Sequence, residues 1–395
     1  MHGAEFGDDQ IKEMMTRELR QRLIEAGEEG RPLRVYCGYD VTAPDIHLGH
    51  TITMRKLRQF QDLGHDVTFL IGTFTTLIGD PSDRDDARTL PLAELVEKNA
   101  LTYAEQAFKV LDREKTSVRY NNDWLGKLTF ADVIRLASHF TVQQFLVRDR
   151  LRNRYEKNEP LWLHELLYPL AQGYDAVHLK TDVQIGATEQ LFNLMAGRKL
   201  QEVFGLKPQI CITYPVLVGT DGEMRMSKSI GNYIGVNEPP EEQYGKIMSL
   251  PDKAMLQYFR LATRWLPDQI DRMITDIQQN RIHPMEAKKK LAWEIVDAFN
   301  DSAAADAAAA HFEQVHQARE YPTDIPSFTL KDSMNIIDLL IATGLCKSKG
   351  EARRMVQQGG VRLDGEPVSG VDVQVDPAEA VLQRGKRHFV RLLQA

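Results

Sequence analysis

Two histidines lie one helical turn apart in the segment His47-Leu48-Gly49-His50. The segment follows an apolar stretch of strand type and begins a stretch of helical pattern. A helix N-terminus presents free backbone N–H groups and a partial positive charge, and both favour phosphate. Glycine at position 49 has no Cβ, so a nucleotide could approach the backbone closely there. The two imidazoles could then donate hydrogen bonds to oxygens that gain charge during displacement at phosphorus.

A second, cationic segment reads Arg225-Met226-Ser227-Lys228-Ser229 and lies between glycines at positions 219, 222 and 231. Such a loop is flexible, and its lysine could close over the β- and γ-phosphates of a nucleotide. Each motif alone has a structural alternative, either two histidines at a helix start or a solvated basic loop. Both motifs in this order favour an enzyme that cleaves ATP at its α-phosphate.

A polar trio, Tyr168, Gln172 and Asp175, follows the spacing i, i+4 and i+7. At 3.6 residues per turn these side chains share one helix face. The structural alternative makes them boundary residues and a helix-end charge. The functional interpretation is a pocket for an amphipathic ligand.

Strand-like and helix-like stretches alternate along residues 1–235 and must position these groups. The alternation indicates an α/β fold, a Rossmann-like parallel sheet with helices on both faces. The predicted strands are residues 33–39, 67–72, 117–120 and 209–218, and the predicted helices are residues 10–25, 50–63 and 92–111.

The composition changes over residues 236–242, which contain Pro239-Pro240, and the pattern is helical from Pro251 to about Gln317. We therefore expect a catalytic domain with an N-terminal helix over residues 1–235 and an all-helical domain over residues 236–320. Pro322 and Pro326 mark a linker over residues 321–330. The remaining residues, 331–395, have the pattern of a small α+β domain.

Composition restricts the class of protein. With 395 residues, 43% of them hydrophobic and 27% charged, the chain can bury a large core. Its three cysteines lie far apart, and no spacing predicts a disulfide framework or a bound metal. The first residues lack a signal-peptide pattern, and no apolar run approaches the roughly 20 residues that span a bilayer. We expect a reduced, cytoplasmic protein with no membrane segment.

The two signatures resemble those of the class I aminoacyl-tRNA synthetases, and further residues are similar to the bacterial tyrosyl-tRNA synthetases. These residues occur in the order of that family over essentially the whole chain: Tyr36-Cys37-Gly38-Tyr39-Asp40 with Thr42 and Ala43, Leu77-Ile78-Gly79-Asp80-Pro81, residues 121–124, and the trio Tyr168, Gln172 and Asp175.

The resemblance implies a tyrosine pocket. Asp175 would accept the phenolic proton of the substrate, and Tyr36 would bond the same oxygen. Asp80, Tyr168 and Gln172 would hold the α-ammonium with Thr75 nearby, and Gln184 and Gln190 would line the pocket. Such a pocket rejects phenylalanine, because its buried polar groups can be satisfied only by a hydroxyl.

The resemblance also implies the remaining site. The expected ATP-binding residues are Gly38, Asp40, His47, Gly49, His50, Gly186, Glu189, Met226, Ser227 and Lys228. His47, His50, Lys228 and Arg225 would stabilise charge in the transition state, with Mg²⁺ on the pyrophosphate. The implied reaction converts L-tyrosine and ATP into tyrosyl-adenylate, and the tyrosyl group then passes to the 3′ end of tRNA(Tyr). A homodimer is implied as well.

Three departures from the family pattern stand out. Ala187 and Glu189 occupy positions where the family usually has Gly and Asp, and Glu189 has an extra methylene. Arg225 replaces the usual first lysine of the loop, which keeps the charge but changes the shape. The loop after Asp80 is unusually acidic, with Asp83, Asp85 and Asp86.

The last segment is similar to a small RNA-binding domain of the ribosomal S-four type. It has a basic helix start followed by Gly359-Gly360-Val361 and an Asp364-Gly365 turn. The expected RNA-binding residues are Lys347, Lys349, Arg353, Arg354, Arg362 and Arg387. The structural alternative is a solvated basic helix face.

Two other functions stay open at this point. Within the class, the amino acid could be tryptophan, although Tyr36 and Asp175 argue against it. The chain could also be an RNA-binding protein that has kept a synthetase body without its activity. The intact His47, His50 and Lys228 argue against that second alternative.

Overall fold

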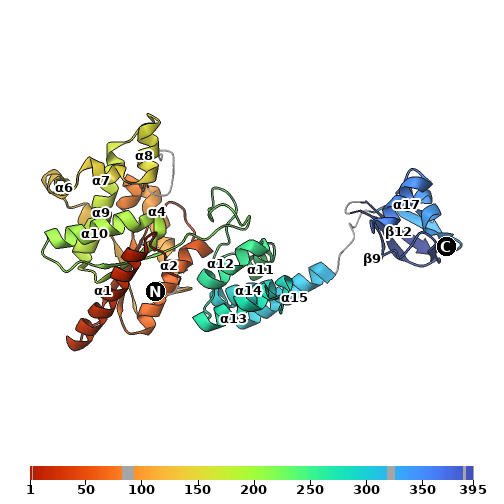
Figure 1. Ribbon diagram of the computed structural model, residues 1–395, viewed down its shortest axis with the longest axis horizontal. Helices are drawn as coiled ribbons and strands as arrows, with labels where there is room; N and C mark the ends of the chain where they lie inside the picture. Colours follow the sequence, from red (N-terminus) through yellow and green to blue (C-terminus); the bar gives the residue numbers. More distant parts are fainter. Residues whose placement is uncertain (2, 82–92, 318–324, 386–387, 395) are drawn as a thin grey trace. The chain divides into compact units, whose positions relative to one another are not determined.

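The computed structural model describes residues 1, 3–81, 93–317, 325–385 and 388–394 (Figure 1). They form two compact units, Met1–Phe312 and Glu313–Ala395. The predicted acidic loop with Asp83, Asp85 and Asp86, and the predicted RNA-binding residue Arg387, lie outside the described residues. No helix in the described ranges is long and apolar enough to cross a membrane.

The first unit is built on a five-stranded parallel sheet in the order β3-β2-β1-β4-β5. The strands are β1 (Arg34–Tyr39), β2 (Asp66–Ile71), β3 (Thr116–Tyr120), β4 (Val183–Ala187) and β5 (Ile210–Tyr214). The strand order reverses between β1 and β4, and such a switch point leaves a crevice at the carboxyl ends of the strands. The predicted α/β fold is confirmed, and β5 ends before Pro215, earlier than the predicted residue 218.

Helices cover both faces of this sheet because side chains alternate along each strand. On β1, Val35 and Cys37 belong to the main core, whereas Tyr36 packs with Trp124 and Ala171 on the other face. The helices of this part are α1 (Asp9–Glu28), α2 (Leu48–Asp62), α3 (Thr75–Ile78), α4 (Ala93–Ala107), α5 (Asn122–Leu125), α6 (Phe130–Ala137), α7 (Val142–Leu146), α8 (Asp149–Glu156), α9 (Leu163–Leu179) and α10 (Leu191–Val203). A short 3₁₀ turn, Thr188–Gln190, joins β4 to α10.

The helical segment after residue 235 shares the core of the sheet. Proline is the first residue of three of its helices, where its fixed φ suits a helix start and its missing N–H costs nothing. The helices are α11 (Pro240–Met248), α12 (Asp252–Ala262), α13 (Pro267–Gln278), α14 (Pro284–Phe299) and α15 (Ser302–Gln317). One hydrophobic cluster runs from the sheet to Phe299 and Ala308, so the boundary at residue 235 remains a prediction.

The second unit has a separate core and a five-stranded sheet in the order β6-β12-β11-β8-β9. Its elements are β6 (Ser327–Leu330), β7 (Met334–Asn335), α16 (Ile336–Ala342), α17 (Lys349–Gln357), β8 (Val361–Leu363), β9 (Glu366–Pro367), β10 (Gln374–Val375), β11 (Ala380–Arg384) and β12 (His388–Gln394). Strand β6 pairs with β12, so residues 327–330 belong to this sheet and not to the predicted linker. Two short strands, β7 and β10, form a separate pair.

Candidate active site

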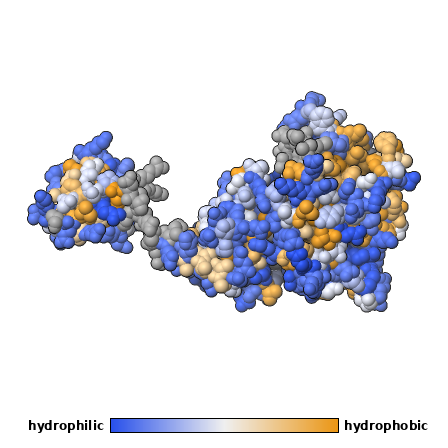
Figure 2. Space-filling view, turned by 180° about the vertical axis from the view of Figure 1, so that it is seen from behind, coloured by the Kyte–Doolittle hydropathy of each residue, from blue (hydrophilic) through white to orange (hydrophobic). Residues whose placement is uncertain are grey.

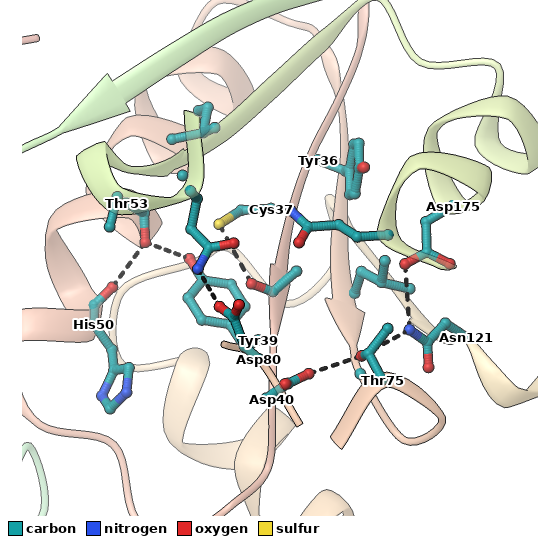
Figure 3. Close-up of a pocket in the computed structure, with 18 of the residues that line it drawn as sticks. Tyr36, Cys37, Tyr39, Asp40, His50, Thr53, Thr75, Asp80, Asn121 and Asp175 are labelled. Carbon is teal, nitrogen blue, oxygen red and sulfur yellow. Dashed lines mark hydrogen bonds between the residues drawn. The ribbon is translucent and has the colours of Figure 1, made fainter. Parts of the chain in front are cut away.

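A polar cavity opens at the carboxyl ends of β1 and β4, and Asp175 lies at one side of it (Figure 3). Asp175 is 2% exposed and accepts hydrogen bonds from Trp124 Nε1 at 2.8 Å and from Asn121 Nδ2 at 3.2 Å. Burial raises the pKa of this carboxyl to about 8, although both hydrogen bonds oppose the rise. The neighbouring Tyr36 hydroxyl is buried and has no hydrogen-bond partner among the described residues. At this end of the cavity, the unpartnered hydroxyl of Tyr36 therefore lies beside the buried carboxyl of Asp175.

The middle of the cavity contains a chain of hydrogen-bonded polar groups. Thr75 Oγ1 donates to Asp40 Oδ1 at 2.7 Å, and the Tyr168 hydroxyl donates to Asp40 Oδ2 at 3.1 Å. Asn121 Nδ2 also donates to Thr75 Oγ1 at 3.0 Å, which connects this group to the Asp175 end. Asp40 and Asp80 both line this cavity, and two carboxylates close to one cavity suit a cation.

Three more predicted residues border the same part of the cavity. Gln190 Nε2 donates to Asp80, and both residues line the cavity. Gln172 lines it too, and its Oε1 is buried with no partner in the described part of the chain. An unsatisfied buried acceptor costs free energy, so a donor from a ligand would relieve that cost.

Gln184 is the exception among the predicted tyrosine-pocket residues. It is fully buried but does not line the cavity, and its Oε1 accepts a hydrogen bond from Gln209 Nε2. Helix α10 covers it, because a Cβ on Gly197 of that helix would lie 3.6 Å from the same oxygen. The prediction that Gln184 lines the pocket is therefore wrong for this structure.

A second cavity adjoins the first and is bordered by both sequence signatures. The two cavities share Gly49, His50 and Glu189, and the second also includes His47, Arg225, Met226, Ser227 and Lys228. Gly38, Asp40 and Gly186 line the first cavity. Every predicted ATP-binding residue thus borders one of two adjoining cavities. The fold brings together segments that lie far apart in the sequence.

The two histidines close the N-terminus of α2 with their own side chains. Gly49 N donates to His47 Nδ1 at 3.2 Å, and His47 N donates to His50 Nδ1 at 3.2 Å. Because both Nδ1 atoms accept hydrogen bonds, each neutral ring carries its proton on Nε2. Glycine at position 49 leaves room for the first ring, because a Cβ there would lie 3.0 Å from His47 Cε1, a tight contact.

Burial keeps both rings neutral. It lowers the pKa of His47 to about 2, with further contributions from His50, Lys228 and Arg225. It likewise lowers the pKa of His50 to about 4, and the positive charge of Lys228 adds to the effect. The pair can therefore act as hydrogen-bond donors across the physiological pH range without titrating.

The loop over residues 225–229 is held at its base by Asn232, which sequence analysis assigned no role. Asn232 Oδ1 accepts a hydrogen bond from Ser227 N at 2.8 Å, and its Nδ2 donates to Arg225 O at 3.1 Å. Met226 is buried in the main core and anchors the loop. A Cβ on Gly219 would collide with Asn232, which explains a glycine at that position.

Asn121 and Trp124, the two donors to Asp175, were not among the predicted site residues. Both occur within the stretch that carries the family resemblance, so their position was the available signal. Asp45 was missed as well. Its Oδ2 lies 2.7 Å from Lys228 Nζ, and no local pattern indicates that contact.

The predicted RNA-binding residues lie in the second unit. Lys347, Lys349, Arg353 and Arg354 are exposed around the first turns of α17. Lys349 pairs with Asp338 at 2.7 Å. Arg362 differs from them, since its guanidinium donates to Gly365 O at 2.9 Å and closes the Asp364-Gly365 turn.

Two family models match this chain. The model described as "tRNA synthetases class I (W and Y)" matches residues 28–317, and the model described as "Tyrosine--tRNA ligase SYY-like C-terminal domain" matches residues 316–392. The Rossmann-like sheet with the two signatures at its switch point agrees with the first match. The fold is that of a class I aminoacyl-tRNA synthetase, and the chain matches the model of that class.

Similar proteins show to which family within this class the chain belongs. The Tyrosine--tRNA ligase of Thermotoga maritima is 47% identical over 95% of this chain and 93% of its own length. That of Moorella thermoacetica is 48% identical over 95% of this chain and 91% of its own. A crystal structure of tyrosyl-tRNA synthetase complexed with L-tyrosine from Archaeoglobus fulgidus has the same fold, with a TM-score of 0.59 and 24% identity over 74% of this chain and 94% of that one. The chain belongs to the tyrosyl-tRNA synthetase family.

Proposed function

We propose that this chain is a tyrosine–tRNA ligase that forms tyrosyl-adenylate from L-tyrosine and ATP and then esterifies tRNA(Tyr). The observation that carries the proposal is the unpartnered Tyr36 hydroxyl beside the buried Asp175, at one end of a polar cavity. A phenolic hydroxyl would supply the missing partner. A side chain without that hydroxyl would leave the buried Tyr36 hydroxyl unsatisfied, which costs free energy.

The opposite end of the substrate would meet the carboxylates. We assign the α-ammonium to Asp80, Tyr168 and Gln172, because Gln172 Oε1 lacks a donor among the described residues. Thr75 and Gln190 would orient the two carboxylates through their hydrogen bonds to Asp40 and Asp80. The ligand would thereby have its carboxylate near the cavity that His50 borders.

ATP would occupy the second cavity as its Mg²⁺ complex, with Mg²⁺ bound to the phosphates as part of the substrate. The tyrosine carboxylate would attack the α-phosphorus in line, with pyrophosphate as the leaving group. No enzyme nucleophile is needed, because holding both reactants together can itself lower the barrier by several kcal/mol. The His47 and His50 Nε2–H groups, Lys228 and Arg225 would stabilise the charge that develops on the phosphates.

Glu189 has a defined place in this scheme despite its departure from the family pattern. It borders both cavities, as does Ala187. The ribose of ATP, placed where the two cavities meet, would therefore lie within reach of the Glu189 carboxylate. The longer Glu side chain can bond a ribose hydroxyl as Asp does. Gly38 and Gly186 would let the adenylate approach the strand ends, since neither has a Cβ.

We propose that tRNA is bound by the helical segment, residues 236–320, and by the C-terminal unit. The exposed cations at the start of α17 suit backbone phosphates. Arg362 would act indirectly, by shaping the turn that its guanidinium closes. Because charging of tRNA serves protein synthesis, we propose the cytoplasm as the compartment.

A homodimer is supported by an apolar surface on α6–α9. Six large apolar residues there have at least half of their surface exposed: Phe130, Ile134, Val142, Val147, Trp162 and Leu163. Figure 2 shows apolar residues gathered over this part of the surface, at the upper right. Contiguous exposed apolar patches mark interaction sites. We expect the native chain to sediment as a dimer and Leu163→Glu to shift it to monomers, whereas a monomeric native chain would contradict the dimer.

The decisive experiment is ATP–pyrophosphate exchange measured with each of the standard amino acids in turn. We expect exchange with tyrosine and at least about 100-fold less with phenylalanine, as the unpaired polar groups predict. Exchange with tryptophan in place of tyrosine would contradict the assignment. A lack of exchange with every amino acid would indicate a synthetase-like protein without activity.

A further inference from the structure

A carboxylate holds the lysine of the 225–229 loop in this structure. Lys228 Nζ lies 2.7 Å from Asp45 Oδ2 and 5.6 Å from the centre of the Tyr233 ring. Asp45 lies two residues before His47 and borders the same cavity as His47, Arg225 and Lys228. A negative charge therefore lies at the edge of the cavity that the proposed function assigns to the phosphates.

The Asp45–Lys228 pair is not what holds the base of the loop. Leu48 N donates to Ile234 O at 2.8 Å, and Val236 N donates to Ile46 O at 3.1 Å. These backbone bonds join the segment after the loop to the segment around His47. Asn232 fixes the stem by its bond from Ser227 N. The ion pair adds a contact at the lysine side chain only.

Water reaches this ion pair. The side chain of Asp45 is 55% exposed and that of Lys228 is 21% exposed. Pairs of this kind contribute little to stability, because solvent screens the attraction and the long lysine side chain must be ordered. The lysine can therefore leave the carboxylate without stranding a buried charge.

We propose that Asp45 is a positioning residue that competes with the phosphates of ATP for Lys228. In the ligand-free protein its carboxylate keeps the ammonium at the cavity, and on binding of ATP the ammonium moves to phosphate oxygens. This inference rests on the proposed function, since it needs ATP in that cavity. Two effects of Asp45 both weaken the binding of ATP. ATP must displace the carboxylate from Lys228, and the negative charge of Asp45 repels the phosphates.

The test is the KM for ATP in tyrosine-dependent pyrophosphate exchange with Asp45→Asn. We expect this KM to fall about two- to fivefold, the range that a solvent-exposed pair can supply. The kcat and the KM for tyrosine should stay within about twofold of native, because Asp45 does not border the cavity assigned to tyrosine. The gap in KM should narrow as salt is added, since added ions screen charges within about 10 Å at 0.1 M.

Two further variants separate charge from structure. Asp45→Ser also removes the charge and should lower the KM for ATP as Asn does, whereas Asp45→Glu keeps the charge and should stay nearer the native value. The matched control is Glu223→Gln, which breaks a pair of the same type, Glu223 with Lys253 at 2.7 Å, beside the loop but outside the cavity. Its KM for ATP should equal the native value.

An unchanged KM for ATP in both Asp45→Asn and Asp45→Ser would overturn the proposal. A raised KM would also overturn it and would make Asp45 a ligand of the ATP complex. Damage to the fold cannot imitate the expected result, because damage does not tighten binding. Failure of the proposed function looks different, since the native chain would then show no tyrosine-dependent exchange at all.

Discussion

At the scale of single residues, the proposed specificity for tyrosine depends on the hydrogen bonds that orient Asp175. Trp124 and Asn121 each donate to one of its oxygens, which orients the carboxyl toward the cavity. Burial raises its pKa to about 8, so the ligand-free protein keeps this group largely neutral at pH 7. A carboxyl in this state can both accept and donate a hydrogen bond. It suits a phenolic hydroxyl that also bonds Tyr36.

Replacing this acid tests the tyrosine pocket directly. We expect Asp175→Asn to lower kcat/KM for tyrosine in pyrophosphate exchange by about 100-fold or more, the cost of a mispaired buried polar group. The KM for ATP should stay within about twofold, because Asp175 does not border the second cavity. The control is Asp123→Asn on the exposed side of α5. Near-native turnover with Asp175→Asn would mean that the pocket is assigned to the wrong residues.

The two buried histidines predict a loss of stability in acid. Their pKa values in the folded protein are about 2 for His47 and about 4 for His50, below the ordinary value of 6.5. As the pH falls below 6.5 the unfolded chain binds protons that the folded chain does not, so the free energy of unfolding decreases. At about pH 5 this amounts to about 1–2 kcal/mol for each histidine.

Urea unfolding at neutral and acid pH measures this effect. His47→Asn keeps an acceptor at the helix N-cap but cannot titrate, so it should lose about 1–2 kcal/mol less than the native chain on acidification. Exposed His311 on α15 provides the control, and His311→Asn should behave as the native chain does. An identical loss in His47→Asn and native protein would contradict the neutral state of the ring.

At the scale of elements, the close packing of α9 on α10 sets the position of the proposed tyrosine-binding face of α9. Gly173 lies between Gln172 and Asp175 on α9, and a Cβ there would lie 3.2 Å from the backbone nitrogen of Gly197 on α10 and 2.9 Å from Leu200 Cδ1. The absence of a side chain at Gly173 lets the two helices approach. Because Gln172 and Asp175 both lie on α9, any increase in the separation of the two helices would shift both side chains in the same direction.

Two glycine-to-alanine changes within helices should therefore have opposite effects. Gly173→Ala should destabilise the protein by about 1–3 kcal/mol through overpacking and raise the KM for tyrosine severalfold. Gly245→Ala on α11 should stabilise it by about 0.5–1 kcal/mol, because no described atom outside its local helix backbone and chain neighbours lies within 4 Å of the added Cβ. Urea midpoints and exchange kinetics measure both. A native KM for tyrosine in Gly173→Ala would show that this packing does not set the pocket.

At the scale of the whole molecule, the described residues form two units with separate hydrophobic cores. The first contains both cavities, and the second contains the exposed cations of α17. Under the proposed function, formation of the adenylate would need only groups from the first unit. Transfer to tRNA would use both.

Removing the second unit should separate the two half-reactions. A chain ending at Gln317 should retain pyrophosphate exchange within about twofold but lose about tenfold or more in kcat/KM for tRNA charging, because phosphate contacts supply much of RNA affinity. Ending there also removes β6, which belongs to the C-terminal sheet. Neutralising Lys347, Lys349, Arg353 and Arg354 together to Gln, with the unit retained, should reproduce most of the loss. Unchanged charging in both variants would exclude the unit from tRNA binding.

Much of this protein was determined by sequence alone. The alternation of strands and helices predicted the α/β fold. The order of the two signatures predicted an enzyme that cleaves ATP at its α-phosphate, and their resemblance to a known family predicted the class. The helical spacing of Tyr168, Gln172 and Asp175 predicted one shared face, and all three line the first cavity. Each of these patterns is made of local features, because periodicity and turn chemistry act over a few residues and are visible in the linear sequence.

Only the tertiary structure decided which distant groups meet. Asn121 and Trp124 lie 54 and 51 residues from Asp175, and Lys228 lies 183 residues from Asp45. Gln184 lies outside the cavity because α10 covers it. Residues 327–330 belong to the C-terminal sheet because they pair with β12. Strand register and helix packing set such contacts, and neither is encoded in the spacing of neighbouring residues.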